Sequence, residues 1–322
     1  MCMEVYLLNK EGENNITNTI TNLTISGEYR SCCRCLSFGF IKSPTDKNTF
    51  TVGIYLGDNV RVVHEGKELF FGVVWSKGKS TDTNEIDITC KDYGIYLNKN
   101  SGTYSFKGMT PENIVKKVCS DFNIPTGNIA STGKSVSRKF SNAKLYDIIM
   151  TCYSLANDKK YMILFNGKNL NVLEKGIEQS KPLENGINLL KTQISESLDS
   201  MVNSVNVYGD KDKIIYSQKD ENNIKLYGLL NTSFKYSKGE DYKNTASKKL
   251  QGIERKVTIQ NFGDVNYITG KAVVVAEEYT GLKGLFYIDA DEHNFKNGIY
   301  TNKLTLNFEN MMDEKESGSG IK

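Results

Sequence analysis

The sequence has 322 residues, of which 39% are hydrophobic and 25% are charged, and its formal net charge is +3. These values are ordinary for a folded protein, so they exclude a disordered or fibrous chain, and the length indicates about two or three domains. The sequence contains no apolar run near the roughly 20 residues that a membrane helix needs. Only five of the 41 basic residues are arginine, so the charge does not indicate a specific nucleic-acid partner.

The first residues, MCMEVYLLNKEGENN, lack a basic segment followed by an apolar run. We therefore expect no secretory signal, with synthesis and folding in the cytoplasm. The seven cysteines are scattered and odd in number, which favours reduced thiols over a disulfide framework.

Residues 1 to about 100 predict a series of short strands separated by turns, at the spacing of a barrel or sandwich. The expected strands are VYLLN, ITNLTISGEY, CLSFGF, FTVGIYL, NVRVVHEG, ELFFGVVWSKG and NEIDITCKDY. VVHEGKELFFG is the clearest hairpin, with EGK as its turn. His64 lies in its first strand, and we expect a surface position or a hydrogen-bonded core position for this lone histidine.

The stretch SCCRCLSFGF, residues 31–40, allows either half of a zinc site or a strand. A structural zinc site needs four ligands, usually in two short pairs. Cys2, Cys90, Cys119 and Cys152 stand alone, and neither His64 nor His293 has a metal-pair neighbour. Because Cys32, Leu36, Phe38 and Phe40 alternate with Cys33, Cys35, Ser37 and Gly39, we favour a half-buried strand without metal.

Residues 101–176 change to a helical period and predict a small α+β module. In TPENIVKKVCSDFNI, Thr110 is the expected cap and Pro111 the first helical residue. A second helix is expected in AKLYDIIMTCYSLAND, and KYMILFNGKNLNVLEKG predicts a hairpin that turns at Asn166 and Gly167. Cys119 and Cys152 lie on the apolar helix faces and indicate core packing rather than catalysis.

Residues 177–310 predict a connector followed by renewed strands. The expected strands are MVNSVNVYG, KIIYSQK, KVTIQNF, GKAVVVAEEYTG, LFYIDADEHNF and KLTLNFEN, with a short helix in EDYKNTASKKLQGI. The charged, Gly/Ser-rich end, residues 311–322, is expected to be mobile.

The two strand-rich regions resemble one another. Gly57, then Leu69 and Phe70, then Ile86 and Ile88 match Gly270, then Leu285 and Phe286, then Leu304 and Leu306 in order, with short loop insertions. This pattern indicates duplication of one barrel around an inserted module. Three such chains in a ring would present six similar barrels, which would match a sixfold partner with threefold symmetry.

The sequence shows no convincing catalytic, cofactor or metal motif, and we predict none of these sites. STGK at 131–134 resembles part of a phosphate loop but has the wrong residue order. On a strand, one face of DADEHNF would carry Asp289, Asp291 and His293, with Glu292 nearby. Carboxylate and histidine side chains on one face could bind a metal ion. No further ligands are evident, so we favour a solvated strand face.

Four stretches together resemble the baseplate hub proteins of PBSX-type prophages, the XkdQ-like proteins, which are relatives of contractile-tail hubs. They are TNLTISGEYRSCCRCLSFGF, LGDNVRVVHEGKELFFGVVWS, GTYSFKGMTPENIVKKVCSDFNIPTGNIA and LYDIIMTCYSLA. GLFYIDADEHNFKNGIYTNKLTLNF is similar to the closing hairpin of that hub. The resemblance runs in order from about residue 16 to 310, and the sequence departs from it at CCRC.

The resemblance implies an α+β, mainly β fold with two tube-type β-barrels. The expected divisions are a first barrel at 1–100, the α+β module at 101–176, a connector and second barrel at 177–310, and the tail. It also implies a non-enzymatic homotrimer that joins the hexameric tail tube to the central spike and contacts other baseplate proteins. Such a protein would assemble in the bacterial cytoplasm and leave in a phage or bacteriocin particle, without a membrane or cofactor.

The alternative is a cell-wall glycan-binding or lytic tail protein that acts through residues 101–176. Helices flanked by a hairpin fit a small glycan-binding fold. However, no aromatic platform stands out beyond Tyr153 and Tyr161, and no pair of acidic residues is evident.

Overall fold

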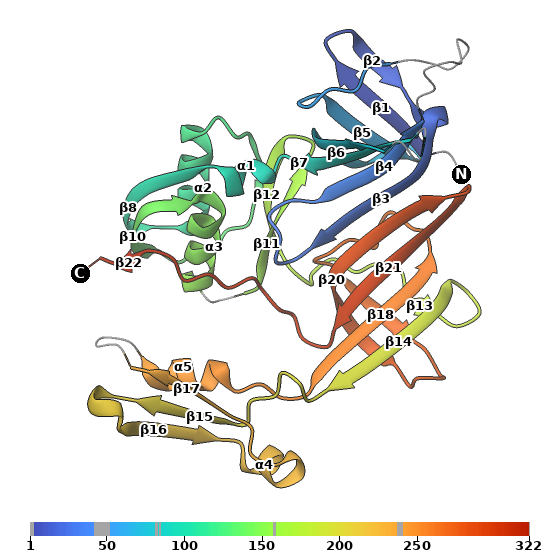
Figure 1. Ribbon diagram of the computed structural model, residues 1–322. Helices are drawn as coiled ribbons and strands as arrows, with labels where there is room; N and C mark the ends of the chain where they lie inside the picture. The colour runs from blue at the N-terminus through green and yellow to red at the C-terminus, as the bar shows by residue number, and fades with distance from the viewer. Residues whose placement is uncertain are drawn as a thin grey trace. The chain divides into compact units, whose positions relative to one another are not determined.

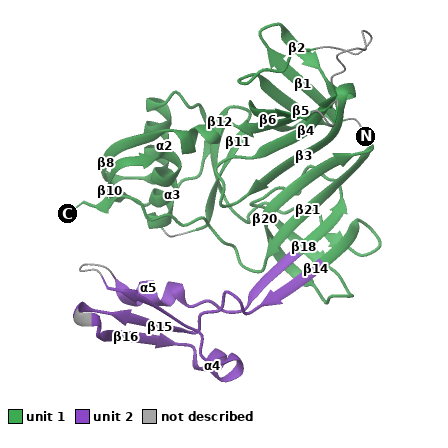
Figure 2. Cartoon of the chain, in the orientation of Figure 1, with its two compact units in different colours: residues 1–192, 258–322 green, residues 193–257 purple. Residues whose placement is uncertain are grey.

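The structure of the protein is a computed structural model that describes residues 3–41, 52–80, 83, 85–156, 159–236 and 241–321. It confirms the α+β, mainly β fold class. The chain forms two compact units: unit 1 contains residues 1–192 and 258–322, and unit 2 contains residues 193–257 (Figure 2). Most strands of unit 1 belong to one 13-stranded sheet.

The first half of this sheet comes from the N-terminal region (Figure 1). Its elements are β1 (Met3–Asn9), β2 (Gly12–Asn15), the 3-10 helix η1 (Thr17–Thr19), β3 (Ile20–Glu28), β4 (Cys35–Ile41), β5 (Asn59–His64), β6 (Lys67–Lys79) and β7 (Glu85–Asp92). The predicted hairpin is confirmed, because Glu65 and Gly66 both have positive φ in the two-residue turn between β5 and β6. The expected strand FTVGIYL does not form over residues 52–56, and its first two residues lie outside the described part of the chain.

The second half comes from the C-terminal region. Its strands are β13 (Leu183–Glu184), β14 (Leu189–Ser197), β18 (Glu254–Phe262), β19 (Ala272–Ala276), β20 (Lys283–Lys296) and β21 (Ile299–Asn307). Strand β20 pairs with β3 over Ala290–Lys296, so one ladder joins the two halves into a continuous sheet.

The two halves share one strand order, which supports the duplication that the sequence predicts. In the first half the neighbours run β3-β4-β7-β6-β5, and in the second they run β14-β18-β21-β20-β19. The strands of each half follow one another along the chain in the same order, so each strand of the first half has a counterpart in the second. The sequence repeat matched β5-β6-β7 to β19-β20-β21, and these strands occupy equivalent places in the sheet. The short turn between β3 and β4 therefore corresponds to the point where unit 2 is inserted between β14 and β18.

The module between the halves contains three helices and two small sheets. Its elements are α1 (Ile95–Lys99), β8 (Ser101–Met109), α2 (Pro111–Asp121), β9 (Thr126–Ile129), β10 (Val136–Lys144), α3 (Leu145–Ala156), β11 (Tyr161–Asn166) and β12 (Asn169–Glu174), and β22 (Ser319–Gly320) pairs with β10. Both predicted helices and the hairpin are confirmed. Thr110 takes the expected N-cap position with extended dihedrals, although its side chain makes no capping hydrogen bond.

The apolar faces of α2 and α3 explain why the module folds as one body. Ile114, Val118 and Cys119 of α2 and Ile149 and Cys152 of α3 are fully buried in one cluster. Burying such side chains stabilises the fold by about 1.5–3 kcal/mol each. The two thiols are thus core residues, as the sequence predicts.

Unit 2 corrects the expectation for residues 177–310, which did not include an insertion. It contains the 3-10 helix η2 (Asp210–Asp212), β15 (Ser204–Tyr208), β16 (Ile214–Lys219), α4 (Glu221–Tyr227), β17 (Asn231–Lys235) and α5 (Tyr242–Lys249). Strands β16-β15-β17 form a separate three-stranded sheet, and Val205, Val207 and Ala246 form its small core. The sequence places these strands in the second barrel because their alternation is locally the same as that of barrel strands.

The C-terminal segment also differs from the expected mobile tail. Met312 is 7% exposed in the module core, and the backbone N–H of Ser317 donates to Thr151 Oγ1 at 3.1 Å. Arg138 Nε donates to the carbonyl of Ser317 at 2.8 Å. One apolar side chain and several backbone hydrogen bonds therefore hold this polar segment against α3 and β10, and its last residue lies outside the described part.

Candidate functional site

The acidic stretch DADEHNF lies in β20, and its environment corrects the expected solvated face. Asp289, Asp291 and His293 share one face, as the sequence predicts, but they are 8%, 2% and 2% exposed. Ala290, Glu292 and Asn294, on the opposite face, are half-buried. Buried charges require partners, and the structure supplies them from segments far away in the chain.

Arg34 and Asp291 form a buried ion pair between the two halves of the sheet. Arg34 Nη1 donates to Asp291 Oδ1 at 2.8 Å, and Nη2 bonds to Oδ2. Oδ1 also accepts from the backbone N–H of Thr269 at 2.8 Å and from its hydroxyl at 2.6 Å. This bidentate geometry with extra donors satisfies the carboxylate and fixes the turn before β4 against β20.

Both histidines of the chain extend this network. His293 Nε2 lies 3.1 Å from Asp291 Oδ2, and its Nδ1 lies 2.6 Å from the Tyr300 hydroxyl and 2.9 Å from Asn302 Nδ2. A ring that donates from Nε2 and accepts at Nδ1 satisfies all these partners. His64 of β5 packs edge-on against Tyr300, with ring centroids 5.0 Å apart, so the predicted lone histidine is a core residue.

The charges in this network shift the ionisation of the buried acids. Burial alone would raise the pKa of Asp291, but the Arg34 guanidinium holds it well below its usual range. Burial raises the pKa of Asp92 to about 6, although backbone N–H groups of Arg34 and Gly94 donate to its carboxylate and oppose the shift. The network thus keeps Asp291 charged while its neighbour Asp92 is easier to protonate.

A second buried pair joins Lys175, which follows β12, to Asp289. The Lys175 side chain is fully buried, bonds to Asp289 Oδ1, and donates to the Met311 carbonyl at 2.9 Å. Its ammonium group also lies 4.1 Å from the ring centre of Tyr29. These contacts link both halves of the sheet, the module and the C-terminal segment through one side chain.

The structure also describes the possible metal ligands and the STGK stretch. Within the described ranges, no three His, Cys, Asp or Glu side chains group in a way that could hold a metal ion. In STGK, the Ser131 hydroxyl and the Thr132 N–H donate to the Glu112 carboxylate. None of the helices in the described part combines the length and hydropathy needed to cross a bilayer.

The aromatic side chains considered for glycan binding are buried in the module. Tyr153 and Tyr161 are 0% and 1% exposed, and their rings pack 4.7 Å apart. The Tyr153 hydroxyl donates to the Ala130 carbonyl at 2.7 Å. A glycan therefore has no access to this pair, so the two rings do not provide an aromatic platform.

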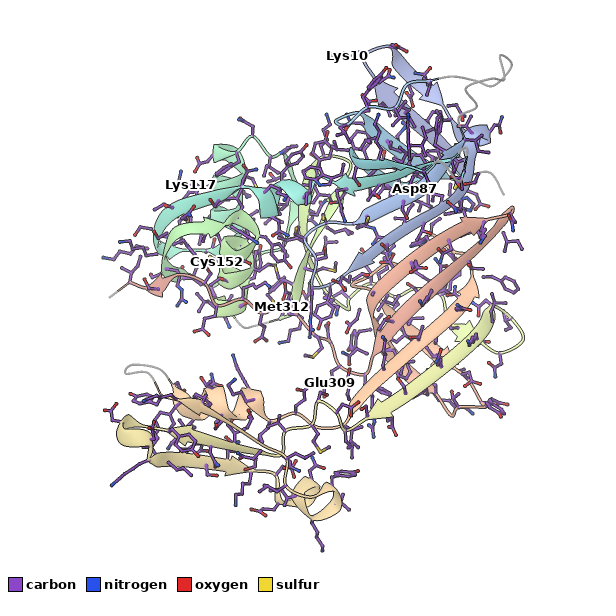
Figure 3. All side chains as sticks on the ribbon, in the orientation of Figure 1. Lys10, Asp87, Lys117, Cys152, Glu309 and Met312 are labelled. Atoms are coloured by element: carbon purple, nitrogen blue, oxygen red, sulfur yellow. The ribbon has the colours of Figure 1, made fainter. Side chains whose placement is uncertain are left out.

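The opposite face of the central strands is accessible and polar. Backbone pairing places Thr301, Asn294, Thr24, Ser37 and Thr89 in one row across β21, β20, β3, β4 and β7. We call the following set the polar face: Thr24, Ser26, Cys35, Ser37, Asp87, Thr89, Lys91, Glu292, Asn294, Thr301, Lys303 and Thr305. Asp87 is marked in Figure 3. Acidic and basic side chains are balanced, with Asp87 and Glu292 against Lys91 and Lys303.

Two open cavities lie on the polar face. One of about 600 Å³ is lined by Thr24, Ser37, Thr89 and Asn294 among others. A second of about 310 Å³ includes Cys33, Cys35, Lys91 and Lys303. Short hydroxyl and amide side chains leave this space, whereas Leu36, Phe38 and Ile88 fill the other face of the same strands.

The sequence predicted the shared face of Asp289, Asp291 and His293 but missed Arg34, Thr269 and Lys175. Arg34 lies 257 residues from Asp291, so no local pattern connects them. The available signal was the place of Arg34 between cysteines in an apolar stretch, where a charged side chain requires a buried partner.

Solved structures of a phage tail protein and of a secretion-system protein have a similar fold. The 43 kDa tail protein of prophage MuSo2 from Shewanella oneidensis superposes with a TM-score of 0.72 at 13% identity, covering 94% of this chain and 97% of that chain. The E. coli c3393 protein, a component of the type VI secretion system with structural similarity to T4 tail proteins gp27 and gp5, gives 0.52 at 8% identity over 93% of this chain and 76% of that one.

The sequence comparison identifies the family. The YQBQ-like family matches residues 23–307, and the chain belongs to it. The Phage-like element PBSX protein XkdQ of Bacillus subtilis (strain 168) is 25% identical over 308 residues, which cover 91% of this chain and 94% of the relative.

Proposed function

We propose that this protein is a structural baseplate hub, in which three copies form a ring that joins a hexameric tail tube to a central spike. The observation that carries this proposal is the shared strand order of the two halves, β3-β4-β7-β6-β5 and β14-β18-β21-β20-β19. Two equivalent halves per chain give a trimer six similar surfaces, as a sixfold tube requires. The similarity to XkdQ and to tail proteins supports the same role.

The proposed division of the chain follows this role. Residues 1–100 form the first tube-type half, 101–176 the module, and 177–310 the second half, interrupted by unit 2. The proposed partners are the tail-tube protein, the spike and other baseplate proteins. Assembly takes place in the bacterial cytoplasm before the particle is released, and the role is structural rather than catalytic.

The mass of the purified chain tests the proposal directly. Light scattering is measured for the chain alone and with the neighbouring tube and spike proteins. We expect a trimer alone, or a monomer that becomes three copies when those partners are added. A monomer that binds neither partner would refute the hub role.

We further propose that the polar face lines the channel of the ring. A dry protein interface would favour apolar side chains at its centre, whereas this face has short polar side chains, balanced charges and open cavities.

The test compares two new thiols in a chain that carries Cys33→Ser and Cys35→Ser. One thiol is Asp87→Cys on the polar face, and the other is Lys10→Cys in the β1–β2 turn (Figure 3).

In the assembled particle, a large polyethylene-glycol maleimide should label Lys10→Cys but not Asp87→Cys, while a small maleimide should label both. In the free chain both reagents should label both sites. Equal labelling of the two sites by the large reagent in the particle would show that the face points outward, even if the trimer forms as proposed.

A further inference from the structure

Three cysteines lie at the start of β4: Cys32 and Cys33 precede it, and Cys35 is its first residue. Cys32 is 2% exposed, whereas Cys33 and Cys35 are half-buried, and all three are free thiols. Cys33 and Cys35 both line the cavity of about 310 Å³ on the polar face. Two nucleophilic side chains therefore meet in one space that small molecules in solvent can enter.

The same cavity carries charges of both signs. Lys91 is paired with Cys35 across the ladder, and its ammonium group is close enough to Cys35 and Cys33 to interact with both electrostatically. Lys303 also lines the cavity, and Glu28 and Glu292 supply carboxylates. A ligand with both carboxylate and ammonium groups finds a complementary partner for each, whereas an uncharged ligand finds none.

The Cys33 thiol ionises more readily than the buried Cys32 thiol beside it. The buried Cys32 thiol donates a hydrogen bond to Cys33 and lowers the Cys33 pKa, although burial acts against this shift. Burial raises the pKa of both Cys119 and Cys152 to about 12, and both are fully buried. Because the thiolate is the nucleophile, Cys33 combines access with ionisation.

We propose that Cys33 is a thiolation site for small peptide-like disulfides that carry carboxylate and ammonium groups, the class to which glutathione disulfide belongs. The Cys33 thiolate attacks one sulfur of the disulfide, the bond between the two ligand sulfurs breaks, and a Cys33–ligand disulfide forms. The other half leaves as a thiolate and takes a proton from water. Cys33 is oxidised and the released thiol is the reduced product.

The test uses the full chain, purified reduced and incubated with glutathione disulfide, with intact mass and peptide mapping as readouts. We expect one glutathione adduct on the peptide that contains Cys33, removed by a reductant. The adduct should be lost in Cys33→Ser and kept in Cys35→Ser. The buried Cys90, Cys119 and Cys152 serve as internal controls and should stay unmodified.

Two further comparisons test the pocket itself. Glutathione disulfide should react several-fold faster than the uncharged hydroxyethyl disulfide, and Lys91→Gln together with Lys303→Gln should reduce this preference. An adduct that persists in Cys33→Ser, an internal disulfide without adduct, or equal rates for both reagents would overturn the proposal. None of these outcomes depends on whether the chain forms a trimer, so the hub role is tested separately.

Discussion

Replacing Arg34 with methionine should strongly destabilise unit 1, because the substitution leaves Asp291 charged and buried. The Arg34 and Asp291 side chains are 10% and 0% exposed, so water screens neither of them. Thr269 and His293 still contact the carboxylate in the variant, but the guanidinium that pairs with it is lost. Removing one partner of a buried pair costs about 3–5 kcal/mol.

Urea unfolding followed by tryptophan and tyrosine fluorescence measures this loss. The matched control is Lys117→Met, which breaks a surface pair with Asp121 whose side chains are 52% and 39% exposed. Such a pair contributes about 0.3–0.5 kcal/mol. The double variant Arg34→Met/Asp291→Asn should recover a large part of the stability, because no uncompensated charge remains. A cost below about 1 kcal/mol for Arg34→Met, or no recovery in the double variant, would refute this reasoning.

The pH dependence gives the same pair a second signature. Because the folded-state pKa of Asp291 lies below its unfolded value, the folded state binds fewer protons at this group. Its contribution is therefore complete above about pH 4 and is lost as the pH falls toward the folded pKa. Asp291→Asn should accordingly show a flatter loss of stability in acid than the native chain. An unchanged acid limb would contradict the assigned shift.

Three further predictions follow from other parts of the structure. Burial raises the pKa of Asp92 to about 6, so the native chain loses stability as the pH rises from 4 to 7. Urea unfolding at each pH tests this, because the stability of Asp92→Asn should rise by up to about 2 kcal/mol relative to the native chain over this range. Met312→Ala should lower the free energy of unfolding by about 2–5 kcal/mol in the same assay, since Met312 is 7% exposed in the module core. The control is Met311→Ala, which removes a half-buried neighbour. A smaller loss for Met312→Ala than for Met311→Ala would show that Met312 does not anchor the segment. Replacing residues 198–253 with a short turn should leave the urea midpoint of unit 1 nearly unchanged, because the equivalent strands β3 and β4 are joined by a short turn; failure to fold would contradict the independence of unit 2.

Local alternation was sufficient to predict most strands, because one face of each is apolar. Leu36, Phe38 and Phe40 of β4 show this pattern and are all buried. The same reasoning missed β8, whose residues are exposed or half-buried except Phe106, so its apolar pattern is weak. Helices α1 and α4 are one or two turns long, too short for a 3.6-residue period to stand out.

The environment of the charged residues was beyond local sequence patterns. Asp291 and Lys175 have the composition of surface positions, and their burial depends on partners that the fold brings together across more than a hundred residues. Unit 2 was missed for a related reason, since β15 and β16 alternate like barrel strands and only their pairing separates them. Periodicity predicts which face of an element is apolar, but it does not predict which element covers that face.

The ladder between β3 and β20 has a consequence for synthesis on the ribosome. Thr24 bonds to Asn294, 270 residues later in the chain. At translation rates of roughly 5–20 residues per second, β3 waits about 14–54 seconds for its neighbour. During that time the edge of β3 has open backbone groups, which can pair with the same edge of another nascent chain. A polysome carries several ribosomes on one message and so holds several nascent copies of the chain close together. The edge of β3 can therefore pair with another copy until β20 is complete and covers it.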